Sequence, residues 1–101
     1  MNQRKAIIVD EKDNVASALA NLTSGEHIEL EVGPMTYKIK LISDIPFGHK
    51  FALKRIGKGE YVIKYGEVIG KATKDIQIGE HVHVHNVESL RARGDLQKTN
   101  L

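Results

Sequence analysis

The segment from His81 to Asn86 contains three of the five histidines of the chain, at every second position. In an extended strand, residues i, i+2 and i+4 project from one face, so His81, His83 and His85 are expected side by side. Imidazoles presented together can bind a metal ion, or can act as acids and bases near neutral pH. The alternative is a polar strand face without a site, because two histidines at i and i+2 reach one metal ion but this segment identifies no third ligand.

A second candidate group lies in the middle of the chain, where His49 and Lys50 follow a glycine. If the glycine-rich loops of the second half fold back on each other, these two side chains approach His83 and His85. They would then supply the missing ligand or a positive charge. His27, in contrast, has the sequence context of an ordinary strand residue, and a lone histidine of this kind usually carries no site.

The C-terminal segment carries Arg91 and Arg93, two guanidinium groups close in sequence to the histidine segment. Arginine can hold a carboxylate or a sulfonate through two parallel hydrogen bonds, so these residues are candidates for binding an anionic substrate. The alternative is a solvated tail, because residues 89 to 101 are polar and have little periodicity.

Length and composition limit the classes of protein. A chain of 101 residues is expected to form one domain, and its 15 basic and 13 acidic residues are interspersed, so no nucleic-acid partner is expected. The absence of cysteine excludes disulfides and thiolate chemistry and agrees with a reducing cytoplasm. The N-terminal apolar run has four residues, too few for a signal segment or a membrane span, so no membrane partner is expected.

The first half is expected to combine a strand, a helix and a hairpin. Residues 5 to 9 are typical of a short buried strand. A helix is predicted after it, with Asp13 as N-cap and Gly25 beyond its end, because apolar residues recur at i, i+3, i+4 and i+7 at Val15, Ala18, Leu19 and Leu22. Two alternating strands, residues 27 to 32 and 36 to 42, are predicted to form a hairpin around a Gly-Pro turn.

The second half contains an internal repeat. The pattern Ile-x-x-Gly-Glu-x-Val occurs at residues 56 to 62 and again at residues 76 to 82. Each copy predicts a turn whose glycine takes a positive φ, followed by a strand that begins at the glutamate. Two such loops folded on each other predict a compact all-β unit. Within one domain we therefore expect an N-terminal part at 1–43, a core at 44–88 and a tail at 89–101.

Four stretches, at residues 45–53, 59–66, 69–76 and 79–86, together resemble the SAF domain of the altronate/galactarate dehydratase family, with matching order and spacing. The resemblance implies a mostly β, β-clip fold with a small α+β N-terminal part. In this family the SAF unit is either the N-terminal domain of a long sugar-acid dehydratase or a separate small subunit, as in altronate dehydratase or (2R)-sulfolactate sulfo-lyase. A chain of 101 residues is expected to be the separate form.

The resemblance implies a lyase that eliminates water or bisulfite from a hydroxy acid such as altronate or sulfolactate, with a divalent metal expected to be Fe²⁺, or Mn²⁺, shared with a large subunit. His81 lies outside the family motif. His83 and His85 are expected to be metal ligands. The same two histidines and His49 are expected to be catalytic. The residues expected to bind substrate are Lys50, Asn86, Arg91 and Arg93.

The expected partners are the large catalytic subunit, without which the chain is expected to be inactive, and a small anionic hydroxy acid. A homo-oligomer is left open. Two alternatives from other classes are a non-catalytic SAF-type binding or assembly module and a free-standing metal carrier. Binding of metal without any partner would distinguish the carrier from the subunit.

Overall fold

A computed structural model describes residues 4–90 of the chain, and its secondary structure there consists of nine strands, all paired antiparallel, with no helix. One sheet contains, in spatial order, β1 (Ala6–Ile7), β2 (Val15–Ala18), β5 (Lys50–Ala52) and β8 (His81–Val82). A hairpin contains β3 (His27–Val32) and β4 (Met35–Lys40), and a third sheet contains β6 (Tyr61–Lys64), β7 (Glu67–Ala72) and β9 (Val87–Ser89). The prediction of a mostly β fold is confirmed.

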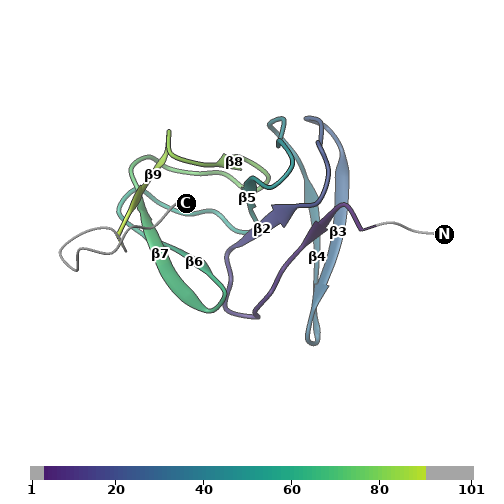
Figure 1. Cartoon of the computed structure of the whole chain (residues 1–101), viewed down its shortest axis with the longest axis horizontal. Coiled ribbons are helices and arrows are strands. Elements are labelled where there is room, and N and C mark those ends of the chain that lie inside the picture. Colours follow the sequence, from purple (N-terminus) through teal and green to yellow (C-terminus); the bar gives the residue numbers. More distant parts are fainter. Residues whose placement is uncertain (1–3, 91–101) are drawn as a thin grey trace.

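The four-stranded sheet lies between the other two, with the β3–β4 hairpin on one side and the β6–β7–β9 sheet on the other (Figure 1). Both of its faces are covered, as shown by neighbouring residues of one strand that belong to different hydrophobic cores. On β5, Phe51 packs into the core beneath the β3–β4 hairpin, and Ala52 packs into the core beneath β6 and β7. Alternation of side chains along a strand produces this division. The central sheet is therefore rigidly held from both sides.

The predicted helix over residues 15 to 22 is wrong. Val15 to Ala18 form β2, which pairs with both β1 and β5 in the centre of the sheet. Val15 enters one core while Ala16 and Ala18 enter the other, so burial on both faces outweighs the helical spacing. Asp13 caps no helix: its buried carboxylate accepts hydrogen bonds from the backbone N–H groups of Asp10 and Gly66, at 3.1 and 2.8 Å.

The β3–β4 hairpin has the predicted alternation and turn. Its register pairs His27 with Lys40 at one end and Val32 with Met35 at the other, around Gly33 at φ 56°. Apolar residues of β3 face the core while its glutamates face solvent. No helix of the described residues is long and apolar enough to cross a membrane.

The repeat predicted from two copies occurs four times in the structure. The turns occupy residues 22–26, 45–49, 56–60 and 76–80, and each has a glycine at its fourth position with φ between 83° and 96°. The first residues of the turns meet in pairs, Leu22 with Ile45 and Ile56 with Ile76, as isolated antiparallel bridges. All four of these residues are buried. The turns thus form two matched pairs that connect the three sheets.

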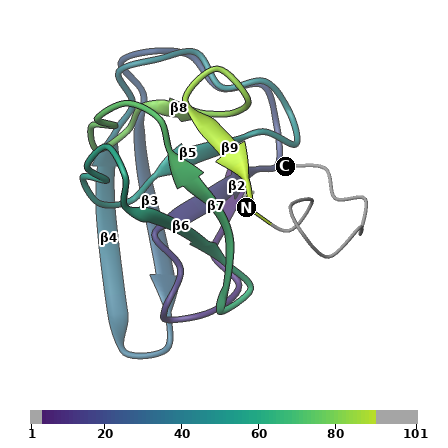
Figure 2. The ribbon, with the colours of Figure 1, turned by 90° about the vertical axis from the view of Figure 1, so that its left-hand side faces the viewer.

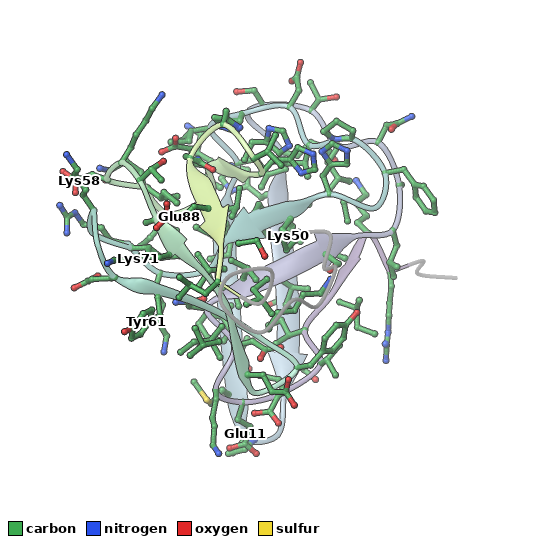
Figure 3. All side chains as sticks on the ribbon, turned by 60° about the vertical axis from the view of Figure 1, so that its left-hand side comes forward. Glu11, Lys50, Lys58, Tyr61, Lys71 and Glu88 are labelled. Carbon is green, nitrogen blue, oxygen red and sulfur yellow. The ribbon has the colours of Figure 1, made fainter. Side chains whose placement is uncertain are left out.

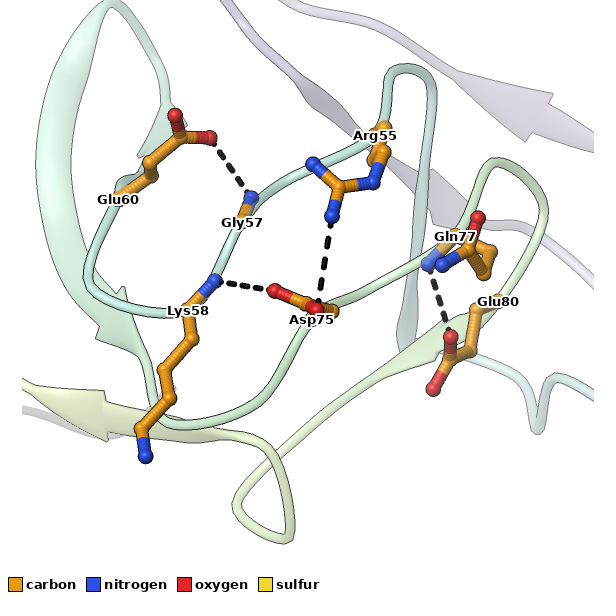
Figure 4. A network of polar contacts seen from close by, with 7 residues as sticks. All are labelled: Arg55, Gly57, Lys58, Glu60, Asp75, Gln77 and Glu80. Atoms are coloured by element: carbon orange, nitrogen blue, oxygen red, sulfur yellow. Dashed lines mark hydrogen bonds and ion pairs between the residues drawn. The ribbon is translucent and has the colours of Figure 1, made fainter.

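In three of the four turns a glutamate closes the turn. Its carboxylate accepts a hydrogen bond from the backbone N–H three residues earlier, at 2.7 Å in the first and third turns and 2.8 Å in the fourth. Figure 4 shows two of these closures, Glu60 with Gly57 and Glu80 with Gln77, together with Asp75, which accepts from the N–H of Lys58 across the pair of turns. A charge-assisted bond of this type stabilises a turn more than a neutral one.

Candidate metal and substrate site

Three histidines meet where the second turn joins the end of β8. His49, His81 and His83 each present a ring nitrogen, and these three nitrogens lie within 4.8 Å of one another. Nδ1 of His49 is 2.9 Å from Nε2 of His81. The rings of His49 and His83 stack, with centroids 4.1 Å apart and planes inclined by 17°. We call these three residues the histidine cluster.

The pairing of β5 with β8 assembles the cluster. Lys50 lies opposite Val82 and Phe51 opposite His81, so one step further along both chains His49 lies across from His83. The predicted strand over residues 81 to 86 is shorter than expected: β8 ends at Val82, and residues 83 to 86 form a turn. In Figure 2 the loop that contains this turn connects β8 to the start of β9 and lies above β9.

Asn86 holds that turn in place. Its side chain is fully buried; Oδ1 accepts a hydrogen bond from the His83 N–H at 3.0 Å, and Nδ2 donates to the His81 carbonyl at 2.9 Å. Asn86 therefore fixes the backbone of two cluster histidines. Its predicted contact with substrate stays a prediction, because a buried amide would have to give up one of these bonds to bind a ligand.

His49 occupies the position at which the other three turns carry the closing glutamate. In this turn the residue three positions earlier is Pro46, which has no backbone N–H to donate. A glutamate at position 49 would have no donor there, so the position is released from closing the turn. The imidazole of His49 instead turns to His81. This contrast within one chain indicates that His49 is present for the cluster and not for the turn.

The surroundings of His81 and His83 favour the uncharged form of both imidazoles. Burial, and next the neighbouring imidazole of His85, lower the pKa of His81 from 6.5 to about 4. Burial is also the largest cause of the lowered pKa of His83, and the nearby His49 and Lys50 add to it. A neutral imidazole keeps a lone pair on one nitrogen, which is the form that binds metals. Nδ1 of His83 is buried and has no hydrogen-bond partner within the described chain.

Lys50, the first residue of β5, follows His49 and is a buried cation whose charge contributes to the lowered pKa of His81 and His83. Its side chain is 3% exposed, and Figure 3 shows it near the centre of the molecule, whereas Lys58 extends from the edge. Burial, and then the positive charge of Lys64, lower the pKa of Lys50 from 10.5 to about 8, and no acidic neighbour among residues 4–90 offsets these effects. An ammonium group held without a counter-ion favours an anionic ligand.

The cluster fits a divalent transition metal. Nitrogen ligands bind such ions at about 2.1 Å, so two ligands at right angles in an octahedral site lie about 3.0 Å apart. The His49 and His81 nitrogens are hydrogen-bonded to each other at 2.9 Å in this structure, a separation that also agrees with this value. Neutral imidazoles suit iron, zinc and copper, and three protein ligands leave coordination positions open for substrate or water.

The structure brings together four of the residues singled out from the sequence. His49 and His83 belong to the cluster, and the charge of Lys50 acts on His83. The ring of His85 is 5.2 Å from that of His81, although His85 is not one of the three clustered residues. His81 adds a cluster member that the family motif left out. The signal for it in the sequence was the every-second-residue spacing. Arg91 and Arg93 lie outside the described residues.

The β architecture and the histidine cluster define a small SAF-type module with three side chains that could hold a metal ion. The chain matches the model of the altronate/galactarate dehydratase SAF domain over residues 4–90, and it therefore belongs to this family. The resemblance predicted from its motifs is confirmed.

Named relatives are of two kinds. An altronate dehydratase of Escherichia coli is 47% identical over 77 residues, which is 76% of this chain and 15% of that protein. An altronate dehydratase of Bacillus subtilis is 40% identical over 83 residues, 82% of this chain and 16% of that protein. The subunit alpha of a (2R)-sulfolactate sulfo-lyase of Paracoccus pantotrophus is 47% identical over 55 residues, 54% of this chain and 82% of that subunit. The chain thus spans about a sixth of the length of the two dehydratases.

Proposed function

We propose that this chain is the small subunit of a metal-dependent lyase that eliminates water or bisulfite from an anionic hydroxy acid such as altronate or sulfolactate. One observation carries the proposal: three imidazoles converge within the electrostatic reach of a buried lysine whose pKa is raised by no acidic group among residues 4–90. This arrangement offers both a metal site and a positive charge for a carboxylate or sulfonate. The names of the relatives support the class of reaction.

His49, His81 and His83 would hold the metal, for which Fe²⁺, or Mn²⁺, is proposed. A divalent ion in such a site supplies Lewis acidity toward a hydroxyl or carboxylate oxygen. Lys50 attracts the charged end of the substrate to the cluster. His85 stands beside the cluster with an exposed side chain, and we assign to it the exchange of a proton with a bound ligand.

The elimination removes a proton from the carbon next to the carboxylate. The electron pair of that C–H bond forms a C=C bond, and the leaving group departs from the adjacent carbon as water, after it accepts a proton, or as bisulfite. The resulting enol becomes a keto acid. The histidine cluster contains no carboxylate, so we propose that the base and most catalytic groups belong to a large catalytic subunit, and that the isolated chain is inactive.

A test combines partner capture with an assay. The chain is purified from its native host, and the material is assayed anaerobically with Fe²⁺ on altronate, galactarate and sulfolactate. Co-purification of a large subunit and release of a keto acid are expected. His83→Ala is expected to abolish turnover, whereas His27→Ala, on the exposed face of β3, serves as the matched control and retains it.

Two results would redirect the assignment. If no partner and no turnover are found, the chain is a binding module. If the isolated chain binds a metal ion tightly and transfers it to a chelator without any partner, it is a metal carrier. In both cases partner capture, turnover and metal binding are also measured for His83→Ala and for the control His27→Ala.

A further inference from the structure

Two exposed apolar side chains flank the histidine cluster. Phe47 is 65% exposed and Val84 is 68% exposed, the highest fractions among the large hydrophobic residues of the described chain. Phe47 lies in the second turn, two residues before His49, and Val84 follows His83. Because His49 and His83 stack at 4.1 Å, the two turns that carry Phe47 and Val84 are neighbours. We call Phe47 and Val84 the cluster rim.

The two rim side chains are not needed to pack the domain. Neither side chain belongs to either core. The second turn is held through the backbone N–H of Phe47, which donates to Asn21 Oδ1 at 2.8 Å, and the other turn is held by Asn86. Both turns would therefore form with polar residues at these positions. Exposed apolar side chains beside a functional site are typical of a surface that another protein covers.

We propose that the cluster rim is the docking surface for the large catalytic subunit, which covers the histidine cluster and faces it with carboxylates. This inference rests on the proposed function and adds to it the face of the domain that is used. Charge complementarity supports an acidic occupant, because Lys50 contributes a positive charge near the cluster and the three clustered side chains include no carboxylate.

The shape of the molecule supports the same occupant. Two hollows of the described residues lie elsewhere: one of about 660 Å³ is lined by residues 4–8 and 27–31, and the other by residues 9–12 and 32–33. Neither includes a cluster histidine, so enclosure of a substrate at the cluster needs a second surface. In the two altronate dehydratases, about five sixths of the protein lies outside the matched segment, which is ample chain for such a surface.

The test is site-specific photocrosslinking of the full chain in its native host. A photoreactive benzoylphenylalanine is placed at position 47, at position 84, or at position 78. Ile78 is the matched control, because it holds the same place in the fourth turn as Phe47 holds in the second and is 48% exposed. Crosslinks from positions 47 and 84, but not 78, to one large lyase chain identified by mass spectrometry are expected, at peptides that contain aspartate or glutamate.

Binding of the crosslinked partner is then measured with Phe47→Asp and Val84→Asp, and with Ile78→Asp as control. We expect at least tenfold weaker binding for the two rim variants, unchanged binding for the control, and unchanged thermal unfolding for all three. A lyase chain that co-purifies but crosslinks only from position 78, or that binds both rim variants normally, overturns the docking surface and leaves the proposed function standing. The absence of any lyase chain from purified material overturns both.

Discussion

Replacing Lys50 with methionine is expected to stabilise the fold while it removes the charge to which we assign substrate attraction. The lysine side chain is 3% exposed, and burial with the nearby Lys64 lowers its pKa from 10.5 to about 8. Because one pKa unit corresponds to about 1.4 kcal/mol, holding this group charged costs at most about 3.5 kcal/mol of unfolding free energy. Methionine has a similar length and no charge, so Lys50→Met is expected to gain about 2 kcal/mol at neutral pH.

The stability difference between Lys50→Met and wild type is expected to depend on pH. Below pH 8 the ammonium is charged in both the folded and the unfolded chain, and the cost is fully present. Between about pH 8 and 10.5 the folded state loses the proton first, so the unfolded state binds more protons and wild-type stability rises with pH. The advantage of Lys50→Met is therefore expected to shrink across this interval.

The assay is urea unfolding followed by circular dichroism at pH 7 and at pH 10, after treatment with a chelator so that no metal contributes to stability. Lys54→Met, at an exposed position, is the control and is expected to change stability by less than about 0.5 kcal/mol. The reasoning is refuted if Lys50→Met is less stable than wild type at pH 7, or if its advantage is as large at pH 10.

The turns and the buried amide give three further predictions, each measured by the same unfolding assay. Gly79→Ala is expected to lower the free energy of unfolding by about 3 kcal/mol or more, because a Cβ there collides with a backbone carbonyl. Gly48→Ala has open space for its Cβ and is expected to cost about 1 kcal/mol from its positive φ alone. Equal losses of stability in the two variants would contradict this contrast. Asn86→Ala is expected to cost about 2 to 3 kcal/mol, since it leaves two backbone groups without partners, and a near-neutral effect would show that the amide does not hold the turn. Glu60→Ala is expected to cost about 1 kcal/mol by removing the acceptor of a turn N–H, and an unchanged stability would discount the closing role of the glutamates.

Alternation along the chain predicted some elements well. The β3–β4 hairpin follows from apolar residues at every second position and from the Gly33-Pro34 turn, because one buried face fixes the register of a strand. The helix over residues 15 to 22 failed because small apolar residues fit both a helical stripe and a central strand covered on two faces. Only the position of β2 between β1 and β5 decides between them, and that is a property of the whole fold.

The candidate site was predictable in part for the same reason. The spacing of the histidines indicated a cluster, but the strand ends at Val82, and the turn that follows folds His83 against His49. The importance of His49 depends on a comparison among four turns, of which the sequence pattern revealed two. The burial of Asn86 depends on how that short turn closes, which no local pattern specifies.

The most direct test of the histidine cluster is to measure metal binding by the full chain, using isothermal titration calorimetry with Co²⁺ under anaerobic conditions. His81→Ala is the informative variant, because the family motif excludes His81 and the geometry includes it. We predict one ion per chain, at least tenfold weaker binding by His81→Ala, and wild-type binding by His27→Ala. Wild-type affinity in His81→Ala, or no binding by the native chain, would contradict the three-histidine centre.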